Sequence, residues 1–195
     1  PATWQFVVDA PQGSAIFTDS DQSLGSSYSY GVSLGDVDGD GDLDAFVANF
    51  SNRANKVWLN NGSGAFSDSG QSLGSSSSWG VSLGDVDGDG DLDAFVANWD
   101  DQANKVWLNN GSGSFSDSGQ SLGSSNSRGV SLGDVDGDGD LDAFVANYNQ
   151  GNKVWLNNGS GSFSVTDQSL GSSYSQGVSL GDVDGDGDLD AFVAK

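Results

Sequence analysis

Aspartates recur at alternate positions in one nine-residue stretch, and their spacing is suited to binding a cation. The stretch, Asp-Val-Asp-Gly-Asp-Gly-Asp-Leu-Asp, occupies residues 36–44 and returns unchanged at 85–93, 134–142 and 182–190. Two carboxylates about 5 Å apart repel each other by roughly 3 kcal/mol at an effective dielectric constant of about 20. Because a cation among the carboxylates removes this repulsion, the sequence predicts one metal site in each copy.

The available ligand types indicate calcium. The chain has neither His nor Cys, so a metal bound here has only oxygen ligands, which hard ions prefer. Calcium accepts six to eight oxygens in a flexible geometry, whereas magnesium requires a near-ideal octahedron. We therefore expect Ca²⁺, at about four ions per chain.

Within the first loop, we expect Asp36, Asp38 and Asp40 to face the ion. Asp44 completes the shell at the start of the next strand, and residue 42 offers its backbone carbonyl, while the intervening glycines let the backbone curl. Every copy repeats this arrangement. The predicted metal residues are therefore Asp36, Asp38, Asp40, Asp42, Asp44, Asp85, Asp87, Asp89, Asp91, Asp93, Asp134, Asp136, Asp138, Asp140, Asp142, Asp182, Asp184, Asp186, Asp188 and Asp190.

Two well-known calcium-binding loops match this stretch less well. An EF-hand loop needs Glu at its twelfth position, which is Val47 here, and it needs flanking helices. Repeat-in-toxin nonapeptides need tandem Gly-Gly-x-Gly-x-Asp, which the chain lacks. Simple solvated turns have no reason to keep five like charges in four identical copies. The strand-like flanks favour a calcium loop within a β-hairpin.

Charge and composition exclude several classes of function. The net charge is −22 with only six Lys and Arg, so nucleic acid and anionic membrane surfaces are poor partners. The chain has no apolar run of about 18 residues, so we expect no segment to insert into a membrane. Without His, Cys or Glu, a Ser-His-Asp set and most acid–base machinery cannot form. We expect a protein that is not an enzyme.

The spacing of the four runs defines an internal repeat. The runs start 49, 49 and 48 residues apart. In the first full copy, short β-prone segments lie at 31–35, 43–48, 56–59 and about 65–73, and Asn61-Gly62 predicts a tight hairpin turn between the last two. No segment shows helical periodicity. Four antiparallel strands per repeat of this length predict an all-β fold, a β-propeller built from four-stranded blades.

The ends of the chain predict one blade split between the termini. Segments 3–8 and 15–24 resemble the two outer strands, whereas 177–195 supplies only the two inner strands. Joining them in one sheet removes exposed edges and locks a ring. Four blades could close alone, pair into an eight-bladed ring or continue head to tail. The expected single repeat domain, 1–195, divides into 1–25 (outer strands of the split blade), 26–74, 75–123, 124–171 and 172–195 (inner strands).

Differences between the copies concentrate in two connections, from the fourth strand to the next blade and from the second strand to the third. In an up-and-down blade both connections lie at the end opposite the aspartate loop. Aromatic and Arg side chains commonly anchor interfaces, and loops on a rigid scaffold carry recognition. Alternatively, Phe50, Trp99 and Tyr148 occupy one equivalent position and pack between blades. The candidate ligand-binding residues are Tyr28, Tyr30, Arg53, Trp79, Trp99, Arg128, Tyr148 and Tyr174.

The loop Asp-x-Asp-x-Asp-Gly-x-x-Asp, placed four times between a small-residue strand and an apolar strand, resembles the FG-GAP repeats of integrin α-subunit propellers and the related VCBS repeats. The resemblance covers nearly the whole chain. It implies side-chain ligation by Asp36, Asp38, Asp40 and Asp44, with the carbonyl of Asp42. This chain lacks the Phe-Gly and Gly-Ala-Pro signatures, and familiar members have seven blades rather than four.

The resemblance also implies a function. It suggests a calcium-stabilised, non-catalytic binding or adhesion module with a protein or carbohydrate ligand. An extracellular or cell-surface location fits calcium modules that need about 10⁻⁴ to 10⁻³ M ion. The alternative is a structural unit that self-assembles through the split blade, as an eight-bladed dimer or a head-to-tail polymer.

Overall fold

The computed structural model describes residues 17, 19–172 and 174–195. In this part of the chain, the regular secondary structure consists of β-strands joined by turns and loops. There is no helix among the described residues, and so none that could cross a membrane. The strands are β1 Ser29–Gly35, β2 Asp44–Asn49, β3 Lys56–Asn60, β4 Phe66–Asp68, β5 Ser78–Gly84, β6 Asp93–Asn98, β7 Lys105–Asn109, β8 Phe115–Asp117, β9 Ser127–Gly133, β10 Asp142–Asn147, β11 Lys153–Asn157, β12 Phe163–Val165, β13 Gly177–Gly181 and β14 Asp190–Ala194.

Each repeat folds into its own antiparallel sheet. The orders are β1-β2-β3-β4, β5-β6-β7-β8 and β9-β10-β11-β12, followed by the two-stranded β13-β14. The pairing of β1 with β2 places Gly35 opposite Asp44 at the aspartate-loop end and Ser29 opposite Asn49 at the other end. The four-stranded blade predicted from the repeat is therefore confirmed, and we number the sheets blade 1 to blade 4.

Two local details differ from the sequence prediction. The fourth strand is only three residues long, because the Asp68 carboxylate accepts the N–H of Gly70 (2.8 Å) and turns the chain there. The backbone rejoins the sheet only at an isolated bridge from Asn55 to Leu73. The hairpin before it is a five-residue loop, 61–65, rather than a two-residue turn, since Asn60 pairs with Phe66.

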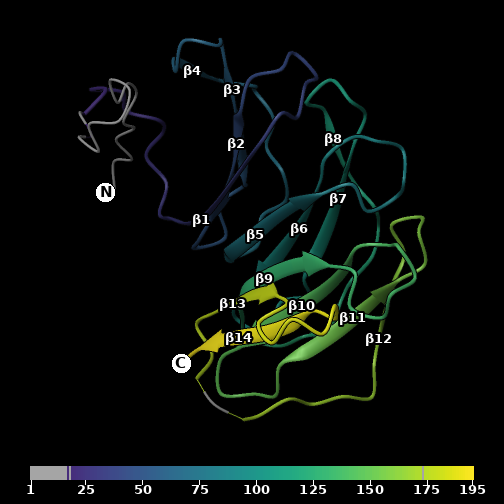
Figure 1. Cartoon of the computed structure of the whole chain (residues 1–195). Helices are drawn as coiled ribbons and strands as arrows, with labels where there is room; N and C mark the ends of the chain where they lie inside the picture. The colour runs from purple at the N-terminus through teal and green to yellow at the C-terminus, as the bar shows by residue number, and fades with distance from the viewer. Residues whose placement is uncertain (1–16, 18, 173) are drawn as a thin grey trace.

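The blades follow one another along an arc, with β1, β5, β9 and β13 side by side on its inner side (Figure 1). Glycines allow this close approach. A Cβ added to Gly31 would lie 2.7 Å from the carbonyl oxygen of Trp79, and one added to Gly80 would lie 2.6 Å from that of Arg128. The small-residue first strand predicted from sequence is thus explained by contact between neighbouring blades.

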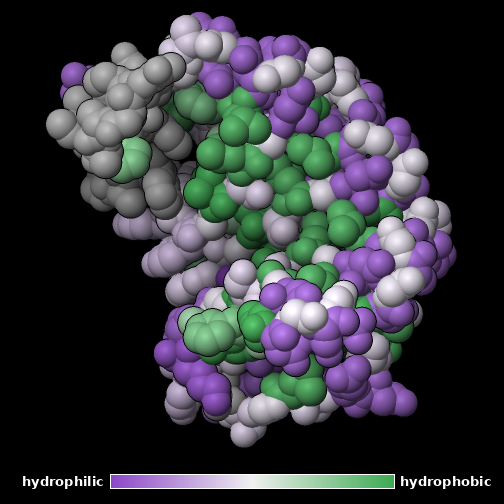
Figure 2. Space-filling view, viewed as in Figure 1, coloured by the Kyte–Doolittle hydropathy of each residue, from purple (hydrophilic) through white to green (hydrophobic). Residues whose placement is uncertain are grey.

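The hydrophobic core lies between blades rather than within one. One cluster joins Phe46 and Val57 of blade 1 to Ala94, Val96 and Trp107 of blade 2. An equivalent cluster joins blades 2 and 3. Hydrophobic residues gather in the middle of the view in Figure 2, while hydrophilic residues follow the outer rim. Each blade is therefore stabilised mainly by its neighbours.

The sheets do not close into a ring within the described residues. Within the described part of the chain, blade 4 consists of β13 and β14. The predicted outer strands of the split blade fall largely on 1–16 and 18, outside the described residues, and residues 17 and 19–24 form no strand.

Candidate metal centres

The four aspartate loops share one backbone path. In the first loop, the carboxylate of Asp36 accepts the N–H of Gly39 (2.8 Å) and the N–H of Gly41 (2.9 Å). These glycines have φ angles of 78° and 93°, in the region that favours glycine. Equivalent bonds recur in the other copies. The backbone thus curls around its first aspartate, as the glycine spacing predicts.

Each loop brings three carboxylates together, with one oxygen of each within 4.8 Å of the others. The aspartates at the first and third positions of the loop take part in every copy. The fifth residue joins them in the first copy, and the ninth joins them in the other three. The groups are Asp36, Asp38 and Asp40; Asp85, Asp87 and Asp93; Asp134, Asp136 and Asp142; and Asp182, Asp184 and Asp190.

The ninth residue of the loop, where the second strand of the blade begins, is buried in the first three copies and partly exposed in the fourth. Asp93 is fully buried, and its two oxygens accept the N–H groups of Val86 (3.0 Å) and Asn109 (2.8 Å). Burial raises the pKa of Asp93 to about 6, although the two N–H groups act in the opposite direction. Burial raises the pKa of Asp142 for the same reason. In the absence of a cation, burial therefore makes the negative charge of these carboxyls less favourable than it is in water.

In the first two copies, the third residue of the loop is also held in an unfavourable environment for negative charge. Burial and the neighbouring Asp44, Asp40 and Asp36 carboxylates raise the pKa of Asp38. Burial and the carboxylates of Asp89 and Asp85 have the same effect on the pKa of Asp87. A bound cation would relieve both the desolvation and the mutual repulsion.

The seventh residue of the loop lies apart from these clusters. The carboxylate of Asp42 lies against Gly62 in the following hairpin loop, and the Asp91 and Asp140 carboxylates lie against the equivalent glycines. Its side chain therefore does not join the carboxylate group. From the sequence, we expect only the backbone carbonyl of this residue to bind the ion. The fifth residues of copies two to four, Asp89, Asp138 and Asp186, are exposed and accept a backbone N–H two residues ahead.

The grouped oxygens fit a calcium ion. Ca²⁺–oxygen distances are about 2.3–2.6 Å, so two ligands of one ion lie at most about 5 Å apart. The 4.8 Å grouping is within this limit. Each carboxylate has about four lone-pair sites, so those that already accept one or two N–H groups keep capacity for a metal. The clusters can hold a hard cation through oxygen atoms alone.

The aspartate loops also connect neighbouring blades. The side chain of Val37, the second loop residue, is 1% exposed in the core between blades 1 and 2. Its carbonyl oxygen accepts the N–H of Gly113 (2.7 Å) and the Nδ2–H of Asn109 (2.8 Å), both from blade 2. Val86 makes the same contacts with blade 3 through Gly161 and Asn157. Order in a loop is therefore transmitted to the interface between blades.

The opposite end of the blades gathers most of the predicted ligand-binding side chains. The guanidinium of Arg128 lies over the rings of Trp79 (4.3 Å), Trp99 (4.5 Å) and Tyr148 (4.0 Å), measured to the ring centroids. Burial lowers the pKa of Arg128, and its Nε has no partner among the described residues. We call Tyr30, Phe50, Trp79, Trp99, Arg128, Tyr148 and Tyr174 the aromatic cluster.

The rings of the aromatic cluster form a continuous row across the blades. Tyr30 stacks on Trp79 at 4.2 Å between centroids, and Trp99 meets Tyr148 at 5.2 Å. Tyr148 in turn lies 4.6 Å from Tyr174. Trp99 and Tyr148 therefore pack between blades and also lie beside the variable residues. Both interpretations of these two positions describe this cluster. Tyr28 and Arg53 are exposed, and within the described part of the chain neither makes a ring contact with it.

A β-bulge sets the direction of the side chain at the variable position of strands β1, β5 and β9. The register of β1 against β2 shifts between Ser29 and Gly31, and β5 and β9 shift at the same place. Tyr30, Trp79 and Arg128 are the extra residues at these bulges. Because a bulge turns a side chain out of the normal alternation, one position per blade can vary without disturbing the sheet.

Two sets of supporting amides were missed in the sequence. Buried Asn49, Asn98 and Asn147 bind the loop between the second and third strands of their blades. For example, the Nδ2–H of Asn98 donates to the carbonyl of Ala103 (2.7 Å). Gln71 reaches the next blade, donating to the carbonyl of Gly113 (2.6 Å) and accepting from the N–H of Phe115 (2.8 Å). The signal that marks them is repetition: the Asn recurs in the first three copies, with Lys195 in its place in the fourth, and the Gln recurs in all four.

The geometry defines an all-β, propeller-like array of four-stranded sheets with an aspartate loop between the first two strands of each. The FG-GAP-like repeat model matches residues 36–96, 85–145 and 134–193. The chain belongs to the FG-GAP-like repeat family. No match was found among curated proteins.

One similar solved structure is the Tc holotoxin pore of Photorhabdus luminescens, at 17% identity and a TM-score of 0.39. The alignment covers 98% of this chain and 12% of the toxin chain. This chain thus spans about an eighth of that protein's length.

Proposed function

We propose that this chain is a calcium-stabilised, non-catalytic binding module that works outside the cell or at its surface. The observation that carries the proposal is the set of four carboxylate clusters, of which the first two lie in loops that also hold the neighbouring blade. Membership in the FG-GAP-like family supports the same assignment. We assign calcium a structural role, because two of the loops that would bind it also fix contacts between blades.

The proposed recognition surface is the aromatic cluster. It combines half-exposed Tyr30 and Tyr174, which are 50% and 55% exposed, with a guanidinium held between rings. Such rigid aromatic and Arg groups favour burial against a protein or carbohydrate ligand. The extracellular assignment follows from the ion, since open calcium modules usually need millimolar-range calcium.

The calcium part is tested by titrating metal-free protein with Ca²⁺ and, separately, Mg²⁺ by isothermal titration calorimetry. We expect about four calcium sites and weaker magnesium binding. Asp136→Asn should remove one site, while Asp140→Asn, in the same loop, should leave the stoichiometry unchanged. A protein that binds no calcium at millimolar concentration would contradict the proposal.

The recognition part is tested with a glycan array and an extracellular-protein array probed with the calcium-loaded chain. Trp79→Ala should abolish any hit, whereas Arg53→Ala, a change of an exposed residue outside the aromatic cluster, should not. Hits that survive Trp79→Ala would place recognition elsewhere on the molecule.

A second candidate function is association of identical chains, favoured by apolar residues left exposed at both ends of the arc. Phe192 is 76% exposed and Val183 is 74% exposed, whereas the equivalent Phe95 and Val86 in blade 2 are at 0% and 1%. At the other end, Leu34 is 53% exposed. These are the two faces that neighbouring blades bury against each other, so a second copy is the matching occupant.

Light scattering coupled to size exclusion in calcium separates this candidate from the first. Association should give a mass well above 19.9 kDa, and Phe192→Asp should return it to the monomer. A monomer of the unchanged chain would eliminate the second candidate and leave the first intact.

A further inference from the structure

Three equivalent cavities lie between the chain segment that enters a blade and the outer strands of that blade. Their volumes are about 210, 220 and 440 Å³ for blades 1, 2 and 3. Each is lined by a Leu-Gly-Ser-Ser segment, a buried Asn, and the Lys and Trp of the third strand. None of these lining residues belongs to the aromatic cluster, and they hardly vary between copies. We call the three cavities the inter-blade pockets.

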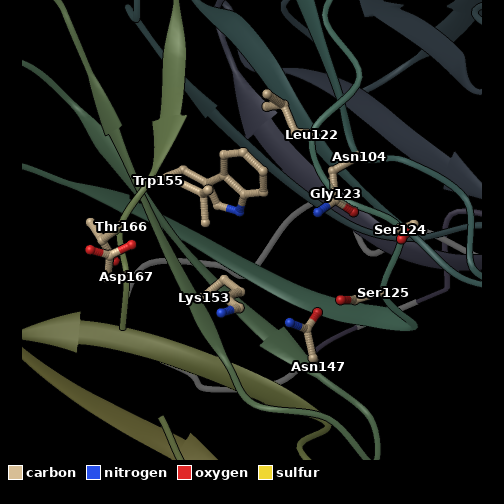
Figure 3. A pocket seen from close by; sticks show the side chains of 11 residues that line it. Asn104, Leu122, Gly123, Ser124, Ser125, Asn147, Lys153, Trp155, Thr166 and Asp167 are labelled. Atoms are coloured by element: carbon tan, nitrogen blue, oxygen red, sulfur yellow. The ribbon is translucent and has the colours of Figure 1, made fainter. Parts of the chain in front are cut away.

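Each pocket contains an indole from the third strand. In blades 2 and 3, Trp107 and Trp155 are both 8% exposed, and the Nε1–H of each has no hydrogen-bond partner among the described residues. Figure 3 shows the nitrogen of Trp155 on the side of the ring turned toward Lys153 and Asn147. Buried donors are almost always satisfied, so a pair of unsatisfied N–H groups at equivalent pockets indicates an acceptor that belongs there.

The rest of the pocket offers both donors and acceptors. In blade 2, Lys105 donates to the carbonyl of Gln120 (2.9 Å) and pairs with Asp117 (3.3 Å). An ammonium has three donors, so one remains for a ligand. The Asp117 carboxylate can accept further hydrogen bonds, and Ser75 and Ser76 line the same cavity. The buried Asn98 is already used by Ser78 and Ala103.

The charge of the pocket selects a neutral ligand. Lys105 and Asp117 cancel, and so do Lys56 and Asp68 in blade 1. The chain as a whole carries −22, which repels anions. A hydroxyl group can both accept from an indole N–H and donate to a carboxylate. Apolar contact with Trp155 and Leu122 further favours a ring with C–H faces.

We propose that the inter-blade pockets bind small neutral polyhydroxyl ligands, namely single sugar residues, with the indole N–H of Trp107 or Trp155 donating to a ligand oxygen. This site is independent of recognition by the aromatic cluster. Blade 3 provides a natural variant of it. Val165 replaces the aspartate of blades 1 and 2, Lys153 donates to the Gln168 carbonyl (3.0 Å), and the cavity is about twice as large.

The test is proton–nitrogen NMR of the indole N–H groups in calcium-loaded, ¹⁵N-labelled protein, with peaks assigned by single Trp→Phe variants. Glucose, galactose, mannose and N-acetylglucosamine are titrated separately at millimolar concentration, with glycerol as a non-specific control. We expect at least one sugar to shift the Trp107 and Trp155 peaks saturably, with the Trp79 and Trp99 peaks unmoved.

Two variants compare the pockets within one chain. Asp117→Asn should weaken the titration at Trp107 about fivefold or more and leave Trp155 unchanged. Val165→Asp places an aspartate where blades 1 and 2 have the partner of the lysine, in addition to Asp167, which already lines this pocket, and the affinity at Trp155 should then approach that at Trp107. Unchanged melting temperatures in calcium serve as the folding control for both variants.

Three results would overturn the proposal. Peaks that no sugar moves would show that the pockets hold water only. Linear shifts equal to those with glycerol would show a non-specific solvent effect. Saturable shifts at Trp79 and Trp99 alone would support the aromatic cluster as the recognition surface and reject the inter-blade pockets.

Discussion

The two ends of the blades are built from the same repeats but differ in what holds neighbouring blades together. At the aspartate-loop end, the carbonyl of Val37 accepts two backbone or amide donors from the next blade. At the opposite end, the aromatic cluster joins blades through side chains, such as Tyr30 stacked on Trp79. Backbone contacts depend on the exact path of the loop, whereas ring contacts tolerate many residue types.

This difference explains where the copies vary. The nine loop residues are identical in all four copies, because each residue fixes a turn, a carboxylate or a contact between blades. The bulge position is Tyr30, Trp79 or Arg128, because its side chain leaves the sheet and only meets other side chains. Stability is thus concentrated at one end of the molecule and freedom to change at the other. Perturbing each end separately tests this division.

Removing the cation should have the largest effect. We expect excess chelator to lower the melting temperature by tens of degrees or to abolish cooperative unfolding, because four clusters of carboxylates lose their compensation together. Circular dichroism melts with calcium and with chelator measure this. Near-UV signals of the aromatic cluster should disappear together with the fold. Superimposable melts in the two conditions would show that the loops do not depend on a metal.

A single substitution should separate the ninth from the seventh position of one loop. Asp93→Asn places an amide donor opposite the N–H groups of Val86 and Asn109 in a fully buried site, and should cost about 2–4 kcal/mol. Asp91→Asn is the matched control, since this side chain lies outside the carboxylate cluster, and should change stability by less than about 0.5 kcal/mol. Denaturant unfolding in calcium measures both. Equal losses would mean that the loop acts through its total charge.

At the aromatic end, Arg128→Ala should be milder. It removes three cation–π contacts and should destabilise the protein by about 1–2 kcal/mol. Arg53→Ala is the control, because Arg53 is exposed, and should have no measurable effect. Calcium affinity should stay the same in both variants. A loss of calcium affinity in Arg128→Ala would show that the two ends are coupled more strongly than their contacts suggest.

Much of the architecture could be predicted because the repeat is nearly exact. Alternating Asp and Gly define a loop by local chemistry, and the small-residue and apolar strands beside it define a blade. The end of β4 at Asp68 also had a local signal, the Asp-Ser-Gly that follows Phe66 and Ser67. It was missed because the strand prediction followed hydrophobic pattern alone.

Neither the burial of residues at the two ends of the arc nor the existence of the inter-blade pockets could be predicted from local sequence patterns. Phe46 and Phe192 lie in the same Asp-Ala-Phe-Val-Ala segment, yet one is 0% and the other 76% exposed. Phe46 is covered by the following four-stranded blade, whereas no such blade follows Phe192 in the described part of the chain, and no local pattern contains this difference. Likewise, the surroundings of the unpartnered Trp155 indole depend on Gly123, which lies against its ring from the segment that enters the blade.

The smallest effect we predict is a reversal of pH dependence between the calcium-free and calcium-bound protein. In chelator, the folded-state pKa of Asp93 is about 6, above its ordinary value of 3.8. The folded protein then binds this proton more tightly than the unfolded chain does. The resulting stability is fully present below about pH 4 and is lost as the pH rises through about 6.

Between pH 7 and pH 5, Asp93 alone should therefore add about 1 kcal/mol to the stability of the calcium-free protein, and the raised pKa of Asp142 acts in the same direction. With calcium bound, the ion holds the carboxylates ionised and depresses their folded-state pKa, so stability should fall as the pH decreases. The measurement is denaturant unfolding at pH 5 and pH 7 in each condition, on a variant or temperature at which the calcium-free protein still folds. Parallel pH dependence in calcium and in chelator would mean that the cation does not contact these buried carboxylates, and that the aspartate-loop end owes its rigidity to backbone hydrogen bonds alone.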